Sequence, residues 1–334
     1  MEQSFHRFEL NIKYFKKGKK IGGGGFGAVF LAQEKSNKRI FAAKILKYDE
    51  KDKLSKKMIY REIKIMMFAN HPAIIKFFGY SNSDFENANN VTILMEYAKN
   101  GSLAGVIQKI QNEEILDYYT NTNKQIILAG VAGAMKYLHD CNIIHRDLKP
   151  GNVLLNENYE PKITDFGLSK CFQQDKSNEQ TIFGGTLEYI APEIHKGDPF
   201  GRKADVYAFA ILMYQVVTNS IPCPELYNGK LTDFQFVELV VYNGYRPKFD
   251  PKKPIKKSLK KLIEKCWSQN PDERPSFQQI FKKLTRYDES KDDCFFDDVD
   301  YDRFNEYIKS ITTIDDPIHN LIQKIVIYPW LMNN

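Results

Sequence analysis

The sequence predicts an α+β fold built from two lobes, the first rich in strands and the second rich in helices. Short runs of alternating apolar and polar residues occupy much of the chain before residue 98, whereas helical spacing of apolar residues dominates from residue 102 onward. At 334 residues the chain is also long for one domain, so two packed units are expected. A cleft between two such lobes is a common place for a ligand.

The composition is that of a globular protein in a reducing compartment. Apolar residues make up 43% of the chain and charged residues 27%, and a net charge of +6 says little about nucleic acid. The five cysteines are odd in number and form no CxxC pair, which argues against a disulfide framework and a zinc site. No apolar run is long enough to cross a bilayer, and residues 1–10 lack the core of a signal peptide. We expect an intracellular, cytoplasmic protein with no membrane segment and no nucleic-acid partner.

The first part of the chain reads as strands around a glycine-rich turn. Residues 1–11 have no clear period and form a leader, and strands are expected at 12–21, 28–32 and 40–46. The turn at 22–27 has the sequence GGGGFG, in which glycine lets backbone N–H groups approach an anion. A dinucleotide-binding fingerprint is the alternative, but it needs a helix directly after the glycines, and a strand follows here.

Lys44 lies inside an otherwise apolar strand, where a buried ammonium group needs a carboxylate partner. A helix predicted at 52–70 offers Glu62, which lies on an apolar stripe with Met58 and Met66. The alternative is a glutamate that pairs with a neighbouring lysine on a solvated face. We favour a Lys44–Glu62 ion pair because of the apolar stripe.

The remaining elements follow from periodicity. Two further strands are expected near 74–78 and 91–97. Helices are expected at 125–139, 202–218, 233–242, 256–267 and 276–285. The lysines within 251–261 alternate with apolar residues, as on the solvated face of an amphipathic helix, and therefore do not indicate a nucleic-acid patch.

A polar segment in the middle of the chain is suited to a metal ion. Asp147 and Asn152 precede a short strand at 153–155, and Asp165 follows a second strand at 162–164. The two strands predict a hairpin that brings the three polar side chains to one patch. Two carboxylates and an amide are hard oxygen ligands of the kind that Mg²⁺ prefers.

These motifs resemble those of eukaryotic protein kinases. Residues 145–152, HRDLKPGN, resemble the catalytic loop of that family, residues 165–167, DFG, its metal-binding triplet, and residues 185–193, GTLEYIAPE, the end of its activation segment. The resemblance covers about residues 12–285 and implies a bilobal protein-kinase-like fold. Its parts would be a small antiparallel-sheet N-lobe with one main helix at about 12–95, a hinge at 96–101 and a larger, mostly helical C-lobe at 102–285.

The resemblance also implies roles for single residues. Asp147 would accept the proton of the substrate hydroxyl and Lys149 would stabilise the transferred phosphoryl group, while Lys44, held by Glu62, would orient the other phosphates. The cofactors would be ATP and Mg²⁺, or Mn²⁺, and the substrates proteins with serine or threonine. The implied ATP-binding positions are Ile21, Gly22, Gly23, Gly24, Gly25, Phe26, Gly27, Val29, Ala42, Lys44, Glu96, Ala98 and Leu154.

Further positions are implied as metal ligands, regulators or braces. Asn152 and Asp165 would hold the metal. Met95 would be the gatekeeper behind the adenine, a role compatible with core packing. The implied regulatory positions are Met95, Arg146, Phe166, Ser177, Thr181 and Thr186, with Arg146 pairing a phosphate on Ser177 or Thr181. Arg274 would pair with Glu193, and Asp205 would brace the catalytic loop.

The subgroup follows from a few positions. Lys149 and Thr186 are typical of serine/threonine kinases, and the CW pair at 266–267 with RPSF at 274–277 resembles their tyrosine-kinase-like group; dual specificity stays open. The rival functions are a pseudokinase scaffold and a Rossmann-type oxidoreductase. A pseudokinase scaffold usually lacks the lysine or one of the aspartates that this chain keeps, and a Rossmann-type oxidoreductase requires a helix after the glycines.

The tail at 286–334 lies outside the resemblance. It is acidic at 288–302 and then carries apolar residues at 304–311 and 318–331. These apolar residues could pack on the large lobe or bind a partner, and the sequence leaves both open.

Overall fold

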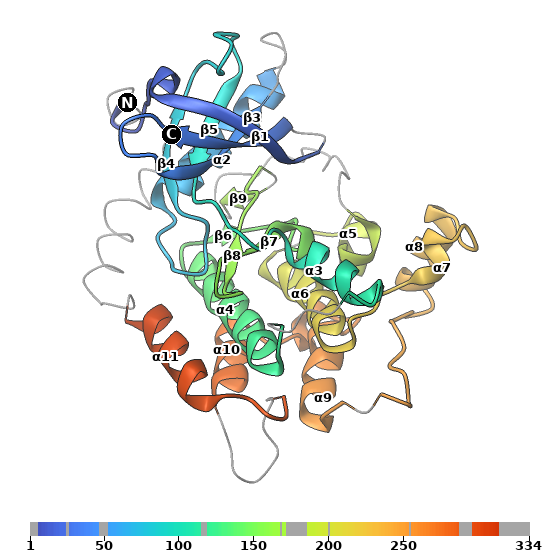
Figure 1. Ribbon diagram of the computed structural model, residues 1–334. Coiled ribbons are helices and arrows are strands. Elements are labelled where there is room, and N and C mark those ends of the chain that lie inside the picture. The colour runs from blue at the N-terminus through green and yellow to red at the C-terminus, as the bar shows by residue number, and fades with distance from the viewer. Residues whose placement is uncertain are drawn as a thin grey trace.

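The computed structural model has a small sheet-containing lobe above a larger helical lobe, as Figure 1 shows. The predicted two-lobe α+β architecture is confirmed. The structure describes residues 6–24, 27–46, 53–114, 119–167, 169–171, 186–199, 201–253, 255–286 and 296–313.

The small lobe is a five-stranded antiparallel sheet with one long helix. Its strands have the spatial order β1-β2-β3-β5-β4, and helix α2 spans Lys53–Phe68. Ile59 and Ile63 of α2 are buried in the same core cluster as Ile93 of the sheet. The strands are β1 (Phe15–Gly24), β2 (Gly27–Glu34), β3 (Ile40–Leu46), β4 (Phe77–Ser81) and β5 (Val91–Met95).

The strand expected at 74–78 was placed too early. Strand β4 begins at Phe77, because the apolar residues before it pair with the other lobe. The Ile75 N–H donates to the Ile163 carbonyl at 2.9 Å, and the Ile163 N–H donates to the Ala73 carbonyl at 2.8 Å. Periodicity alone cannot show which lobe an apolar run joins.

Residues 8–10, within the segment predicted to be a leader, cover the edge of the sheet. The Leu10 N–H donates to the Tyr80 carbonyl at 2.7 Å, and the Tyr80 N–H donates to the Phe8 carbonyl at 3.0 Å. The rings of Phe8 and Phe77 lie 5.8 Å apart. Because β4 is the last strand of the sheet, this segment pairs an edge that would otherwise be open.

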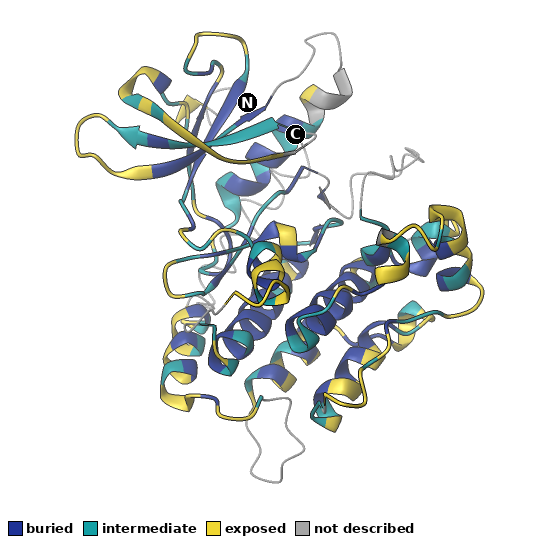
Figure 2. Cartoon of the chain, turned by 45° about the vertical axis from the view of Figure 1, so that its right-hand side comes forward, coloured by how far each residue is buried: buried dark blue, intermediate teal, exposed yellow. Residues whose placement is uncertain are grey.

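The large lobe is mostly helical, and each helix predicted for it is present within a few residues of its expected ends. Helix α6 is apolar on all sides and lies in the interior, with Phe209, Leu212 and Met213 fully buried, and buried helices fill the centre of this lobe in Figure 2. The helices are α3 (Leu103–Gln111), α4 (Asn121–Asp140), α5 (Pro192–His195), α6 (Arg202–Thr218), α7 (Pro224–Tyr227), α8 (Asp233–Val241), α9 (Lys257–Cys266), α10 (Phe277–Thr285) and α11 (Tyr301–Thr312).

Four short strands lie between the lobes. β6 (Ile143–Ile144) pairs with β9 (Lys170–Cys171), and β7 (Val153–Leu155) pairs with β8 (Pro161–Ile163). The second pair is the predicted hairpin. Single turns of 3₁₀ helix lie at Ile12–Tyr14, Pro150–Asn152, Leu187–Tyr189 and Pro271–Glu273.

Candidate active site

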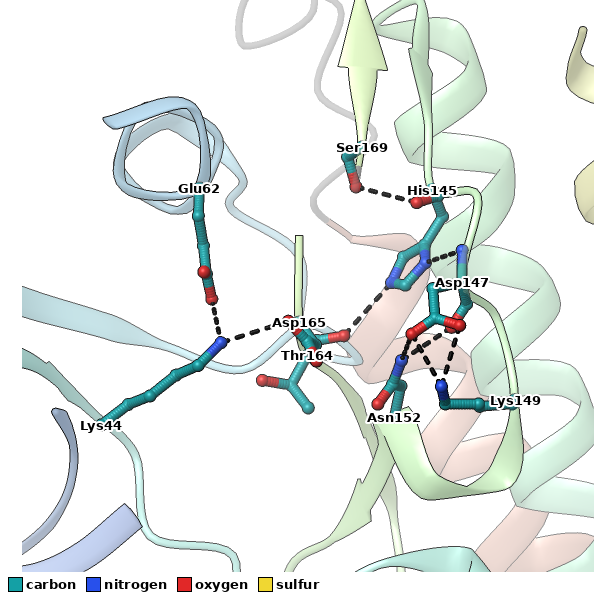
Figure 3. Close-up of polar contacts among 9 residues, drawn as sticks. All are labelled: Lys44, Glu62, His145, Asp147, Lys149, Asn152, Thr164, Asp165 and Ser169. Carbon is teal, nitrogen blue, oxygen red and sulfur yellow. Dashed lines mark hydrogen bonds and ion pairs between the residues drawn. The ribbon is translucent and has the colours of Figure 1, made fainter. Parts of the chain in front are cut away.

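Asp147, Lys149 and Asn152 meet in the loop between β6 and β7. The Asn152 Nδ2 group donates to both the carbonyl oxygen and Oδ2 of Asp147, each at 2.7 Å, as drawn in Figure 3. Lys149 Nζ lies 2.9 Å from the Asp147 carboxylate. The loop is short enough for these contacts to form locally, and they fix the carboxylate of Asp147 at the mouth of the β7–β8 hairpin.

The loop is held from below by Asp205 of α6, as the sequence led us to expect. The backbone N–H groups of His145 and Arg146 each donate to the Asp205 carboxylate at 2.9 Å, and His139 Nε2 donates to it at 2.8 Å. Burial acts to raise the pKa of Asp205, but these hydrogen bonds and the His139 charge outweigh it and hold the pKa below its ordinary value. Arg146 adopts a left-handed φ of 70°, which the two bonds to Asp205 support.

Asp165 lies on the other side of the hairpin and faces the small lobe. The Thr164 N–H donates to the Asn152 carbonyl at 3.0 Å, so the segments that carry Asn152 and Asp165 are tied together. Burial would raise the pKa of Asp165, but the charge and hydrogen bond of Lys44, with weaker contributions from His145 and Lys149, hold it below its ordinary value. The side chain is therefore a carboxylate at neutral pH.

The Lys44–Glu62 ion pair expected from the sequence is present, and Asp165 joins it. Lys44 Nζ lies 2.6 Å from Glu62 Oε1 and 3.1 Å from Asp165 Oδ1 (Figure 3). Burial alone would lower the pKa of Lys44, but the two carboxylates outweigh burial and raise it. One ammonium group thus links β3, α2 and the large lobe.

The predicted ATP-binding positions line the sheet and hinge around this cluster. Val29 is paired with Lys44 across β2 and β3, and Ala42 with Met95 across β3 and β5. Leu154 of β7 forms a bridge with Ser102 below the hinge. Ile21, Gly22, Gly23 and Gly24 are at the end of β1, and Gly27 begins β2.

Gly27 is the position in the glycine turn where a side chain is excluded. Its φ is 147°, and a Cβ there would lie 2.1 Å from the Ile45 carbonyl oxygen. The absence of a side chain therefore lets the start of β2 approach Ile45 of β3 closely. The neighbouring Gly25 and Phe26 lie outside the described residues.

The hinge residues differ in what their groups contact. The Glu96 carboxylate lies 3.2 Å from Lys162 Nζ, and the Glu96 N–H donates to the Lys76 carbonyl at 2.9 Å. The carbonyl of Ala98 accepts from the Gly101 N–H at 3.3 Å, and Ala98 and Met95 are buried. The side chain of Glu96 is thus engaged by the protein itself.

The predicted regulatory positions are spread over several places. Phe166 is fully buried with its ring 5.3 Å from that of His145, and Thr186 is half-buried directly before the 3₁₀ turn Leu187–Tyr189. Ser177 and Thr181 lie outside the described residues.

The Arg274–Glu193 pair expected from the resemblance is present and buried. The two terminal nitrogens of Arg274 donate to the two carboxylate oxygens of Glu193 at 2.7 and 2.8 Å. Arg274 also donates to the carbonyls of Ser268 and Lys203, so its guanidinium group joins three segments of the large lobe.

Sequence reasoning missed several supporting residues. His139 braces Asp205, the Ser169 hydroxyl donates to the His145 carbonyl at 3.1 Å, and the Tyr189 hydroxyl donates to Gln215. The available signal was a polar residue within an apolar helical stripe, which applies to His139 and Gln215 but does not identify their partners.

The chain belongs to the protein kinase family. The family model described as a protein kinase domain matches residues 15–284. The protein kinase resemblance carried by the motifs is thereby confirmed. Domains of this family use ATP with divalent metal ions.

Three relatives illustrate the similarity. A probable serine/threonine-protein kinase drkC of Dictyostelium discoideum is 37% identical over 79% of this chain and 34% of its own length. The serine/threonine-protein kinase STY17 of Arabidopsis thaliana is 30% identical over 84% of this chain and 45% of its own. The mouse NUAK family SNF1-like kinase 1 is 35% identical over 65% of this chain and 32% of its own. The chain thus spans between about a third and under half of these relatives.

Within the described residues, no helix combines the length and apolar character needed to traverse a membrane. Cys223 is buried and carries a free thiol.

Proposed function

We propose that this chain is an ATP-dependent protein kinase that transfers the γ-phosphoryl group of ATP to serine or threonine hydroxyls of protein substrates. The observation that carries the proposal is the pairing of two clusters across the lobes. Asp147 is held by Asn152 and Lys149, and Lys44 bridges Glu62 and Asp165 (Figure 3). Two of the similar relatives are named serine/threonine-protein kinases, which supports the same reaction.

Asp147 would act as the general base and aligning group. Its carboxylate accepts the proton of the substrate hydroxyl as the oxygen bonds to the γ-phosphorus and the bond to the leaving ADP oxygen breaks. Lys149, 2.9 Å from the same carboxylate, places a positive charge where the transferred group carries negative charge. Lys44 would hold the other phosphates in line, with Glu62 fixing its ammonium group.

Asn152 and Asp165 fit a divalent metal, which we propose to be Mg²⁺, with Mn²⁺ as the alternative. Asn152 uses its amide nitrogen on Asp147, which leaves its amide oxygen for a cation, and the low pKa keeps Asp165 charged. Oxygen donors of this kind suit hard cations. When bound, the ion would neutralise phosphate charge during transfer.

Substrate class and control follow from further residues. Lys149 and Thr186 support the serine/threonine class, with dual specificity as the alternative, and residues 266–267 and 274–277 support the tyrosine-kinase-like group. Phosphorylation of Ser177 or Thr181 would place a charge that Arg146 can pair with and so order the activation segment. Phosphosite mapping of fully active protein that finds neither residue modified would contradict this control. The five cysteines, odd in number and without a CxxC pair, support a reducing, cytoplasmic location.

The test compares wild-type protein with Asp147→Asn in phosphate transfer from labelled ATP to a mixed Ser/Thr substrate. Loss of the base should lower the rate by about 10² to 10⁴, while nucleotide binding persists. Asp198→Asn, at an exposed aspartate, is the matched control and should keep wild-type activity. Equal rates in Asp147→Asn and wild type would reject the assignment, and inactive wild-type protein that still binds nucleotide would favour the pseudokinase reading.

A further inference from the structure

Helix α11 lies beyond residue 284, where the family match ends, yet it packs against α4 of the large lobe (Figure 1). We propose that residues 296–313 complete the catalytic unit and position the β7–β8 hairpin, and through it the proposed metal ligands Asn152 and Asp165. These residues are a positioning element, because none of them contacts the site itself in the described structure. The sequence had left open whether this tail packs on the large lobe or binds a partner.

The apolar face of α11 is buried inside the molecule. Phe304, Tyr307 and Ile311 recur at helical spacing, and all three are buried, Phe304 to an exposure of 1%. They belong to the main core cluster of the protein. Polar residues on the other side of the helix, such as Asn305 and Lys309, are exposed. The helix therefore has one apolar face, and that face packs against the large lobe of the same chain.

Two glycines of α4 form the seat for this face. A Cβ on Gly130 would lie 2.1 Å from the Tyr307 hydroxyl and 2.6 Å from Pro161 of β8, and one on Gly133 would lie 3.4 Å from Ile311. Glycine disfavours a helix interior, so its presence here indicates a packing need. Gly130 lets α11, α4 and the hairpin meet at one point.

Polar contacts tie the same segment to the start of α4. The Phe296 N–H donates to Gln125 Oε1 at 3.2 Å, and the Asp300 N–H donates to Thr122 Oγ1 at 2.8 Å. Gln125 is fully buried and donates through its own amide to the Leu284 carbonyl at 2.8 Å. The buried Gln125 thus links α4 to the end of α10 and to the segment that enters α11, which argues against a passive tail.

The link to the site runs through the hairpin turn. The Arg303 guanidinium group donates to the Asn158 carbonyl at 2.9 Å, and Asn123 of α4 donates to the same oxygen at 3.3 Å. Asn158 lies in the turn between β7 and β8, and those strands carry Asn152 and Asp165 at their other ends. Fixing the turn and Pro161 therefore restricts tilting of the hairpin, as supporting residues do for metal ligands elsewhere.

The first test measures whether α11 belongs to the folded unit, and it does not depend on kinase activity. In the full chain, Phe304→Ala should lower the Tm by about 5 °C or more and reduce amide-exchange protection in α4 and the hairpin. Phe234→Ala, at a phenylalanine that is 78% exposed on α8, is the matched control and should change neither. If Phe304→Ala fails to fold, the same measurements are made on Gly130→Ala. Its control is Gly105→Ala, because a Cβ at Gly105 meets only Ser102 Oγ at 3.6 Å. Wild-type Tm and protection in Phe304→Ala, or in Gly130→Ala, would overturn the proposal.

The second test measures positioning and rests on the proposed function. Arg303→Ala removes the bond to the hairpin turn and should raise the Mg²⁺ concentration for half-maximal rate about three- to tenfold, at a temperature well below its Tm. Lys309→Ala, on the exposed side of the same helix, should leave that concentration unchanged. An unchanged Mg²⁺ requirement in Arg303→Ala would refute the positioning role. Inactive wild-type protein would refute the proposed function, and the exchange test would still decide whether α11 belongs to the unit.

Discussion

In the large lobe, Asp147 follows two residues whose backbone N–H groups donate to the buried carboxylate of Asp205. In the small lobe, by contrast, Lys44 is positioned by an ion pair at the end of its long side chain. The large-lobe half is braced through backbone atoms and a carboxylate that is 1% exposed. The small-lobe half depends on an ion pair between two elements, β3 and α2. This difference indicates that the small-lobe half of the site can rearrange without unfolding of the protein, whereas the large-lobe half cannot.

The small-lobe half also connects the lobes. Lys44 reaches Asp165 of the large lobe at 3.1 Å, so this contact forms only when the lobes are close. The segment after α2 is tied to the large lobe through Ile75 and Ile163, and the Asn70 N–H donates to the Tyr137 hydroxyl at 3.0 Å. Movement of α2 is thus restricted at its C-terminal end, while Glu62 lies nearer its middle.

The largest effect should come from the large-lobe brace. In Asp205→Asn the amide nitrogen would face a backbone N–H or the His139 ring, so one buried donor loses its acceptor. We expect the free energy of unfolding to fall by about 3 kcal/mol or more, measured by denaturant titration. Asp198→Asn at the exposed position serves as the control. A change below about 1 kcal/mol in Asp205→Asn would show that the loop is held by other contacts.

The same brace should have a defined pH dependence. The pKa of Asp205 in the folded state lies below its ordinary value of 3.8, so its contribution to stability is present above that pH and is lost as pH falls through the folded-state pKa. The stability difference between wild type and Asp205→Asn should therefore be constant from pH 7 to about 5 and shrink below about 4. A difference that grows on acidification would contradict the assignment.

A smaller effect, on activity more than on stability, is expected in the small-lobe half. Glu62→Gln removes one charge-assisted bond to Lys44 while Asp165 remains, so kcat/KM should fall by about 10- to 100-fold. Glu86→Gln is the control, because Glu86 pairs with Lys17 at 2.7 Å on the surface and such pairs contribute little. If Glu62→Gln instead lost stability as strongly as Asp205→Asn, the two halves would not differ in the way described.

The smallest effect concerns the hinge between the two halves. Gly101 has a φ of 68° with open space around it, so Gly101→Ala should cost about 1 kcal/mol of stability from backbone strain alone. Gly105→Ala, inside α3 with room for a Cβ, should gain up to about 1 kcal/mol. Thermal unfolding of both variants measures the contrast, and a stabilising Gly101→Ala would reject the strain argument.

Much of the fold was predictable because its signals are local. Helices α6, α8, α9 and α10 begin and end near the expected residues, since amphipathic or apolar periodicity and capping residues act within one element. The start of β4 could not be predicted, because Ile74 and Ile75 were equally suited to a strand and to the lobe interface. The packing of α11 on the large lobe could not be predicted either, since its apolar face could have met any apolar surface.

The sequence by itself determined the chemistry available to this protein. Asp147, Lys149 and Asn152 lie within one short loop, so their contacts depend on local backbone geometry, and the apolar setting of Lys44 already required a carboxylate. Only the tertiary structure decided that Asp165 shares this lysine, that His139 holds the Asp205 carboxylate, and that α11 supports the hairpin. Those contacts join segments far apart in the chain, and the packing of both lobes selects them among many apolar and charged surfaces of similar character.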